Sequence, residues 1–460
     1  MKVKGGRLEF LVPHLLRGQL LRPSFLRLSL RLGAAHLMPG WAKLQFLNCG
    51  VSDRDLDRVL DRIASLEGWT NEWQALGREQ EAAGRRALGF GQPTEARRHF
   101  LAATASFNFA QYVLFQDVER KRALHEACVN AYAQAAPLLD PPARPFEVPF
   151  RRRLMRGYLR LPPGPRPVPV VVLFNGTNGV KEELHWWSEV LLARGLAAIT
   201  FDGPGLGQTF HRLSMVAEPR PVGLAIVNEI QAHPELDPNA IAFFGQSLGG
   251  YLALRMAAFD PRIKAVAAVS PPYSADVYWN VTLAALRREL AALYGMDESE
   301  MGREIHRITL AEALPRVRCP LMITGGGHDL ITPGEEAWRI YEDARCEREL
   351  VYYPHAGHDC FNVLGDLRPR IAGWLTRKLA AQRSRPAYPS PPRAEEAEAA
   401  WTAGEAVDPD FADALRGEYP PRAWHPPEAP RMPARWRSPL DPPTDGPVEV
   451  VLRHAAAALA

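Results

Sequence analysis

The sequence predicts a mostly parallel β-sheet with helices on both faces, preceded by a smaller helical domain. Between residues 146 and 380, apolar runs of strand length alternate with helical segments, an order typical of parallel sheets in α/β proteins. From residue 52 to 139, apolar residues recur every three or four positions, which is the period of an amphipathic helix. A serine flanked by glycines follows one predicted strand and indicates where the chemistry of this sheet lies.

The helical domain is expected to contain four helices. The first has one apolar face that includes Leu56 and Leu60, and the third begins at Pro93 and Thr94, which are typical of a helix start. Pro137 ends the fourth. We expect the aromatic residues of this domain to form its core, while one face is available to cover an active site. The expected helices span residues 53–66, 74–88, 94–115 and 123–136.

The sheet is expected to begin with an antiparallel pair of strands, at 146–150 and 154–161. The run 168–174 is apolar throughout, as expected of a parallel strand that is buried on both faces. Further strands are expected at 196–201, 241–244, 265–270, 321–324 and 349–353. Helices are expected at 181–194, 222–232, 248–259, 333–343 and 366–380, with a helical insertion at 281–314.

The chain divides into a basic leader (1–45), a cap-like helical domain (46–145), a catalytic domain (146–382) and a proline-rich tail (383–460). The leader carries eight Lys or Arg against one acid. That composition fits an organelle-type presequence, a membrane-surface helix or, as we expect, a poorly ordered extension. The tail has few aliphatic residues, so its burial cannot offset chain entropy and we expect it to be disordered.

Composition argues against several classes of protein. The net charge is +3 without a basic stripe, so we expect no nucleic-acid partner. There is no run of 18 apolar residues, so we expect no stable membrane insertion. The five cysteines are scattered without a C-x-x-C pair, which indicates reduced thiols in a cytoplasmic protein rather than a disulfide framework or a metal site.

The segment Gly245-Gln246-Ser247-Leu248-Gly249 has the pattern G-x-S-x-G between a predicted strand and a predicted helix. This is where an α/β-hydrolase places its nucleophile, because glycines without a Cβ let the chain double back and present the serine above the sheet. Ser247 is therefore the candidate nucleophile. The intermediate of acyl transfer needs two N–H donors, and we expect them from Leu248 and from Thr177 in the loop after strand 168–174.

A serine nucleophile needs a base and an acid, which follow it in the order acid, histidine in α/β-hydrolases. Asp329 follows strand 321–324 and His358 follows strand 349–353, so both are expected at the carboxyl edge of the sheet. His358 is preferred because Ala356 and Gly357 let the loop turn tightly before it. The rival bases are His328 and His355, and the rival acids are Asp276 and Asp359.

Several segments together resemble the 2,6-dihydroxypseudooxynicotine hydrolase group of α/β-hydrolases, over roughly residues 50 to 380. They are Gly176-Thr177 with Lys181-Glu182-Glu183, the run Phe201-Asp202-Gly203-Pro204-Gly205-Leu206-Gly207, Ser247 to Gly250, and the loops of Asp329 and His358. The Asp-Gly-Pro-Gly-x-Gly run is the most specific of these. The resemblance implies a triad of Ser247, Asp329 and His358, no metal or organic cofactor, a helical domain over the active site, and a homodimer.

One departure from the group concerns an additional acid that the nicotine-pathway member is thought to use after the strand that follows the nucleophile helix. In this chain the segment 273–280 has Asp276 as its single acid, and the role of Asp276 stays open.

We therefore expect a cofactor-independent serine hydrolase that acts on a small carbonyl compound, with C–C bond hydrolysis of an aryl ketone or β-diketone as one reaction. A carboxylesterase or thioesterase of secondary metabolism is the alternative enzyme, and a non-catalytic binding protein on a hydrolase scaffold is the alternative outside enzymes. Five side chains are either pocket walls or packing residues: His185, Trp186, Trp187, Tyr273 and Tyr278.

Overall fold

The computed structural model describes residues 40–114, 117–210, 212–216, 218–275, 279, 284–381 and 450–454. Most of the predicted leader and tail, together with Asp276 and Tyr278, lie outside the described residues. None of the described helices is long and apolar enough to cross a membrane.

Nine strands of the described residues form one sheet in the order β1-β2-β4-β3-β5-β6-β7-β8-β9. The strands from β4 to β8 run parallel, while β1 and β2 at one edge and β9 at the other are antiparallel. This confirms the predicted mostly parallel sheet. The strands are β1 (Arg144–Phe150), β2 (Arg153–Arg160), β3 (Val168–Phe174), β4 (Ala197–Phe201), β5 (Leu236–Gln246), β6 (Ile263–Val269), β7 (Leu321–Gly326), β8 (Arg348–Tyr353) and β9 (Val450–His454).

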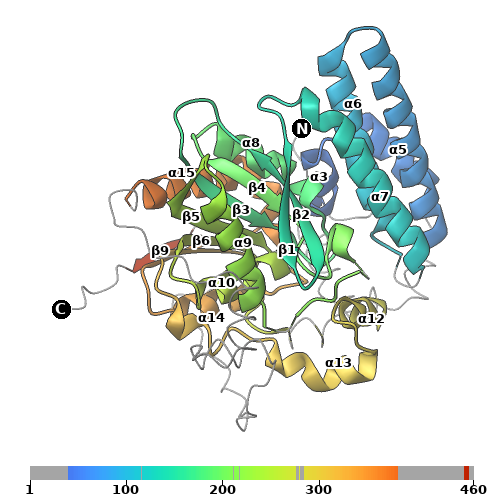
Figure 1. The fold of residues 1–460 in the computed structure, drawn as a ribbon. Helices are drawn as coiled ribbons and strands as arrows, with labels where there is room; N and C mark the ends of the chain where they lie inside the picture. Colours follow the sequence, from blue (N-terminus) through green and yellow to red (C-terminus); the bar gives the residue numbers. More distant parts are fainter. Residues whose placement is uncertain are drawn as a thin grey trace.

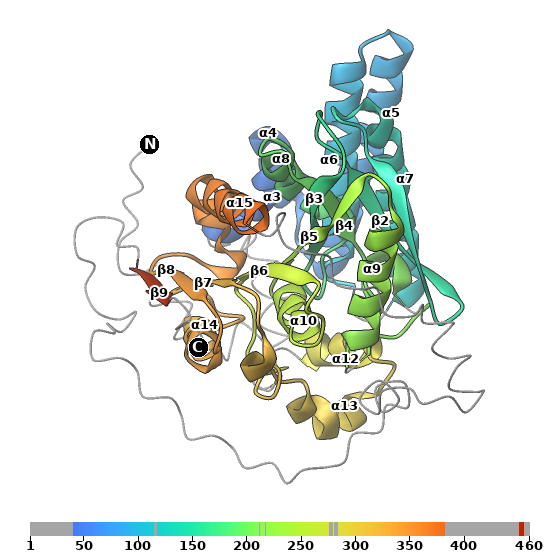
Figure 2. The same ribbon diagram turned by 60° about the vertical axis from the view of Figure 1, so that its left-hand side comes forward.

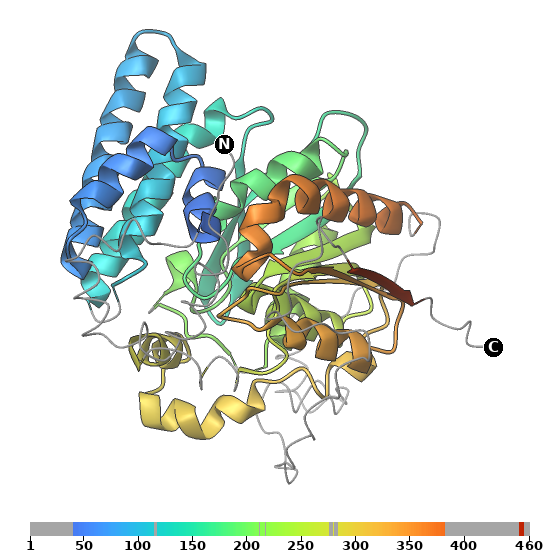
Figure 3. The ribbon, with the colours of Figure 1, turned by 180° about the vertical axis from the view of Figure 1, so that it is seen from behind.

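Helices cover both faces of the sheet (Figure 2). α8 (His185–Leu192) and α15 (Leu364–Ala380) lie on one face, and α15 crosses in front of the strands in Figure 3. α9 (Arg220–Ala232), α10 (Leu248–Ala257) and α14 (Gly334–Asp343) lie on the other. Side chains of a strand alternate between faces, so Val170 and Val172 of β3 join one core while Val171 and Leu173 join the other. The apolar run of β3 is thus explained by burial on both sides.

The predicted helical insertion lies between β6 and β7. It contains α12 (Ala284–Leu293) and α13 (Glu298–Glu304), which lie below the sheet in Figure 1. Asp297 caps α13 by accepting the N–H of Glu300, whose side chain accepts the N–H of Asp297 in return.

The N-terminal helices stand beside the sheet (Figure 1). They are α3 (Gly40–Asn48), α4 (Asp53–Arg62), α5 (Leu66–Gly89), α6 (Pro93–Gln111) and α7 (Val118–Ala135). α5 and α6 pack so closely that a Cβ at Gly77 would lie 2.7 Å from the ring of Phe107. The absence of a side chain at Gly77 allows this close packing. Trp69, Trp73 and Phe109 are buried among one another, which confirms that these aromatics form a core.

Several elements differ from the sequence-based expectation. α3 was not expected, and α7 and β5 each begin five residues earlier than expected, at Val118 and Leu236. α4 ends at Arg62 and α5 begins at Leu66, eight residues before the expected start, because Ser65 caps the helix by accepting the N–H of Gly68 at 2.9 Å. Residues 450–454, within the segment expected to be a disordered tail, form β9 and pair with β8. The edge of β8 offers unpaired backbone groups to a further strand.

Candidate active site

Ser247 occupies the turn between β5 and α10 in a strained backbone conformation, with φ 50° and ψ −122°. A residue with a side chain adopts such angles at a cost, and they are typical of a serine presented at a strand-to-helix turn. A Cβ at Gly249 would overlap the carbonyl oxygen of Phe174, and a Cβ at Gly245 would overlap the backbone of Gly249. The two glycines are therefore required for β5, β3 and α10 to approach this closely.

The loop after β3 lies against Ser247. A Cβ at Gly176 would be 3.2 Å from the Cβ of Ser247. Asn175 fixes this loop, since its Oδ1 accepts the N–H of Gly176 at 2.8 Å and its Nδ2 donates to the carbonyl of Val180 at 3.1 Å. Thr177 thus follows a residue in contact with the nucleophile turn.

Leu248 is the first residue of α10. The N–H groups at the start of a helix have no intrahelical acceptor, so that of Leu248 is free of the helix ladder. Its position directly after Ser247 suits an oxyanion donor.

His358 and Asp329 form a buried pair. Nδ1 of His358 is 2.8 Å from Asp329 Oδ2, and Asp329 Oδ1 accepts the N–H groups of Ile331 and Thr332 at 2.9 and 2.8 Å. These three hydrogen bonds fix the orientation of the Asp329 carboxylate. Burial lowers the pKa of His358, but the charges of Asp329 and Asp359 outweigh burial and raise it to about 9.

The other candidate base residues do not occupy this position. His355 is exposed, and its ring packs against that of His328 with 5.4 Å between the centroids. Of the candidate acids, Asp276 lies outside the described residues. Asp359 is buried on the opposite side of the imidazole, with Oδ2 3.7 Å from Nε2 of His358. Sequence reasoning ranked Asp359 only as a rival to Asp329, because adjacency to His358 does not tell which ring nitrogen its carboxyl faces.

The glycine-rich run after β4 encloses the carboxylate of Asp202. Asp202 Oδ1 accepts the N–H of Lys181 at 2.8 Å, while Oδ2 accepts from Lys181 Nζ at 2.9 Å and from the N–H of Gln208 at 3.0 Å. A Cβ at Gly207 would overlap this carboxylate. The glycine-rich run, which is the most specific sequence motif, thus has a structural role. Through Asp202 it fixes the segment that follows the Thr177 loop.

A pocket of about 190 Å³ lies next to Thr177, between the helical region and the loops of the sheet. Gln111 and Lys121 line it from the helices, and Gly205 and Phe210 line it from the glycine-rich segment. Much of this volume is open to solvent, and the enclosed part has room for about one water molecule.

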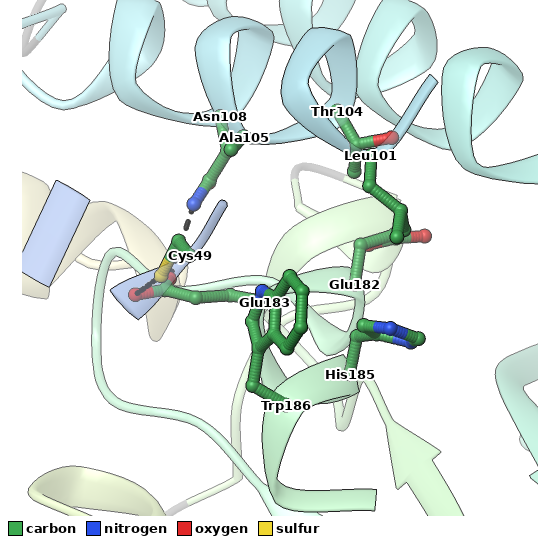
Figure 4. Close-up of a pocket in the computed structure, with 9 residues that line it drawn as sticks. All are labelled: Cys49, Leu101, Thr104, Ala105, Asn108, Glu182, Glu183, His185 and Trp186. Carbon is green, nitrogen blue, oxygen red and sulfur yellow. Dashed lines mark hydrogen bonds between the residues drawn. The ribbon is translucent and has the colours of Figure 1, made fainter. Parts of the chain in front are cut away.

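A second pocket of about 280 Å³ lies between α6 and the segment that leads into α8 (Figure 4). Asn108, Glu183, His185 and Trp186 are among its lining residues, which do not include Ser247. Burial lowers the pKa of His185 to about 3, so this imidazole is neutral, and its Nδ1 lies 3.2 Å from the hydroxyl of Tyr132.

The remaining candidate wall residues have structural contacts. Trp187 is buried beneath α8 in the sheet core. The hydroxyl of Tyr273 donates to Asp343 at 2.6 Å. Tyr278 lies outside the described residues.

Comparison with known proteins agrees with this architecture. A family model described as "Esterase FrsA-like" matches residues 45–292, and one described as "Acetyl xylan esterase (AXE1)" matches residues 223–377. The 2,6-dihydropseudooxynicotine hydrolase of Paenarthrobacter nicotinovorans is 30% identical over 348 residues, covering 75% of this chain and 93% of that protein. The alpha/beta hydrolase pydG of an Acremonium species is 30% identical over 380 residues, covering 69% of this chain and 86% of that protein.

A crystal structure of the 2,6-dihydroxy-pseudo-oxynicotine hydrolase aligns with a TM-score of 0.68 at 28% identity, over 75% of this chain and 98% of that one. These relatives are hydrolases, so the chain is an enzyme rather than a binding protein on a hydrolase scaffold. It belongs to the FrsA-like esterase family, within the 2,6-dihydroxypseudooxynicotine hydrolase-like group of α/β-hydrolases.

Proposed function

We propose that this enzyme is a cofactor-independent serine hydrolase whose triad is Ser247, Asp329 and His358. The observation that carries the proposal is the 2.8 Å contact between Asp329 and Nδ1 of His358, in loops at the same sheet edge as the strained Ser247. An imidazole held at Nδ1 by a carboxylate keeps Nε2 available as a base.

The reaction has two stages. Nε2 of His358 takes the proton of Ser247 Oγ, which bonds to the substrate carbonyl carbon while the N–H groups of Leu248 and Thr177 stabilise the oxyanion. The tetrahedral intermediate then collapses, and the leaving group departs with the electron pair of the broken bond. The proton that His358 took from Ser247 is passed on to the leaving group, which leaves His358 neutral. Water attacks the acyl-enzyme with His358 again as base, which releases the acid and restores Ser247.

We infer that the substrate is an aryl ketone or β-diketone whose C–C bond is hydrolysed. The relative with 93% of its length matched is named as a hydrolase of 2,6-dihydropseudooxynicotine, which favours this class. A carbanion leaving group requires a neighbouring carbonyl or electron-poor ring, which such substrates supply. Carboxylester hydrolysis is the second candidate, because both matching family models are described as esterases.

Covalent labelling tests the nucleophile. A fluorophosphonate probe should label the parent enzyme and the control Ser188→Ala, whose buried serine lies on α8, but not Ser247→Ala. Turnover by Ser247→Ala should fall by about 10⁴- to 10⁶-fold. Labelling of folded Ser247→Ala at the parent rate, or turnover within tenfold of the parent, would contradict the assignment.

A substrate panel separates the two reactions. Simple esters, aryl ketones and β-diketones are incubated with the parent and with Ser247→Ala, and products are identified by mass. Acid and ketone products from a β-diketone support C–C hydrolysis, whereas cleavage of esters alone supports the esterase. We further propose a homodimer, as the resemblance implies, and a cytoplasmic location, as the cysteine pattern indicates. A monomer mass by light scattering would refute the dimer.

A further inference from the structure

The imidazole of His358 lies between two carboxyl groups. Asp329 is 2.8 Å from Nδ1, and Asp359 Oδ2 is 3.7 Å from Nε2, the nitrogen that acts as base in the proposed mechanism. Asp359 is 7% exposed, and its Oδ1 has no hydrogen-bond partner among the residues that the structure describes. Asp329 already orients the ring, so the second carboxyl calls for a separate explanation.

The surroundings of Asp359 come from several elements. They are His358 on the same loop, Asp329 after β7, Glu183 before α8, the backbone of Ser247, and Ser270 Oγ, to which the N–H of Asp359 donates at 3.1 Å. Burial raises the pKa of Asp359 to about 7 against the charge of His358, and the two acids add to the rise. A proton held on Asp359 instead of on Nε2 leaves His358 neutral, and this form of the pair has both the acid and the base that the reaction needs.

On the basis of the serine hydrolase function proposed above, we propose that Asp359 is a second proton-transfer residue, which protonates the leaving group. The bond between the carbonyl carbon and the leaving atom breaks, its electron pair stays with that atom, and the atom takes the proton of Asp359. The His358 imidazolium, formed when Ser247 lost its proton, then returns a proton to Asp359. His358 is neutral again, as the attack of water on the acyl-enzyme requires.

The local geometry fits this role. Asp359 has a φ of 54°, in the left-handed region that costs energy for a residue with a side chain, and this turn brings its carboxyl beside Nε2. A separation of 3.7 Å is longer than a hydrogen bond. Catalytic contacts of free enzymes often shorten when substrate binds.

The proposal predicts a dependence on the leaving group. A 4-nitrophenolate leaves without a proton, whereas an alkoxide or a carbanion must be protonated. The test compares kcat/KM of the parent, Asp359→Asn and Asp359→Glu on 4-nitrophenyl acetate, phenyl acetate, ethyl acetate and a β-diketone. Asp359→Asn should lose about 10²- to 10⁴-fold on the poorest leaving groups, the usual contribution of general acid catalysis, and less than tenfold on 4-nitrophenyl acetate. Asp359→Glu, which keeps a carboxyl, should recover part of the loss.

The pH profile gives a readout that a structural role would not change. His358 acts as a base only above its pKa, which Asp359 helps to raise. Without that charge, the acid limb of kcat/KM on 4-nitrophenyl acetate should move to lower pH by about one to two units. Asp57→Asn, which removes an exposed carboxylate on α4, is the matched control and should leave the profile in place.

The outcomes are distinguishable. An equal loss on every substrate with an unshifted acid limb would overturn the proposal and leave Asp359 a structural residue. A parent enzyme that the fluorophosphonate probe does not label, or equal turnover by the parent and Ser247→Ala, would instead overturn the proposed triad and the role of Asp359 with it.

Discussion

Glu183 joins the N-terminal helices to the loop beside the nucleophile. Its replacement should therefore lower both the stability of the protein and its activity. One carboxylate oxygen accepts from Gln45 at 3.0 Å, and the other accepts from Asn108 at 3.0 Å, Tyr112 at 2.9 Å and Asn175 at 3.2 Å. Figure 4 shows the side chain between α6 and the segment that leads into α8. Because these neighbours all donate, the isosteric change Glu183→Gln places an NH₂ group against other donors.

The expected cost follows from these contacts. A hydrogen bond to a charged group contributes about 1.5–3 kcal/mol, and losses within one network are not additive. Glu183 is half-buried, so water replaces part of what is lost. We therefore expect Glu183→Gln to reduce the free energy of unfolding by about 2–4 kcal/mol, which corresponds to a fall in Tm of several degrees for a domain of this size.

Activity should fall as well, because Asn175 would lose one of its three side-chain hydrogen bonds and the Thr177 loop would move. Differential scanning fluorimetry and steady-state kinetics on 4-nitrophenyl acetate test this, with kcat expected to fall more than KM rises. Glu119→Gln, on the exposed face of α7, is the control for loss of an acidic residue. A Tm within 1 °C of the parent together with unchanged kcat would refute the reasoning.

Two further results are expected. Asp329→Asn should lower kcat by about 10⁴-fold with little change in fold, since an amide at this position favours the wrong tautomer of His358; a loss below tenfold, measured by steady-state kinetics, would exclude Asp329 as the triad acid. Burial lowers the pKa of His185 from 6.5 to about 3 in the folded chain. As the pH falls below 6.5, the unfolded chain therefore binds a proton that the folded chain does not. The free energy of unfolding then falls by at most about 1.4 kcal/mol per pH unit. Urea unfolding from pH 7 to 4 should show a shallower slope in His185→Gln, and identical slopes would contradict the burial of a neutral imidazole.

The strands were predictable because their signal is local. β3 was expected at the residues where it lies, since each of its side chains is buried and the run is apolar throughout. The start of α5 was missed because the apolar spacing of the first helix continues through Ile63 to Leu66, which placed the capping serine, Ser65, inside that helix. β9 was missed because its partner, β8, precedes it by about a hundred residues and five residues carry little pattern of their own.

The candidate triad could be ordered from sequence because each member directly follows a strand, and parallel strands end at one edge. The same reasoning could name Asp359 only as a rival to Asp329. The side of the imidazole that its carboxyl faces depends on two positive φ angles in one turn, which the sequence does not reveal. The partners of Glu183 were also beyond sequence reasoning. Gln45 and Tyr112 lie 138 and 71 residues away along the chain.

The segment from Asn175 to Glu183 explains why the most specific sequence motif does not contain a proposed catalytic residue. Lys181 binds both oxygens of Asp202 through its N–H and its Nζ. Two residues later, Glu183 binds Asn175 and the N-terminal helices. The loop that carries Thr177 is therefore held from the sheet on one side and from the helices on the other. In the proposed mechanism, changes in the glycine-rich run would therefore alter turnover by moving the Thr177 N–H, and the helical region would contribute to the active site through Glu183 without touching the reacting atoms.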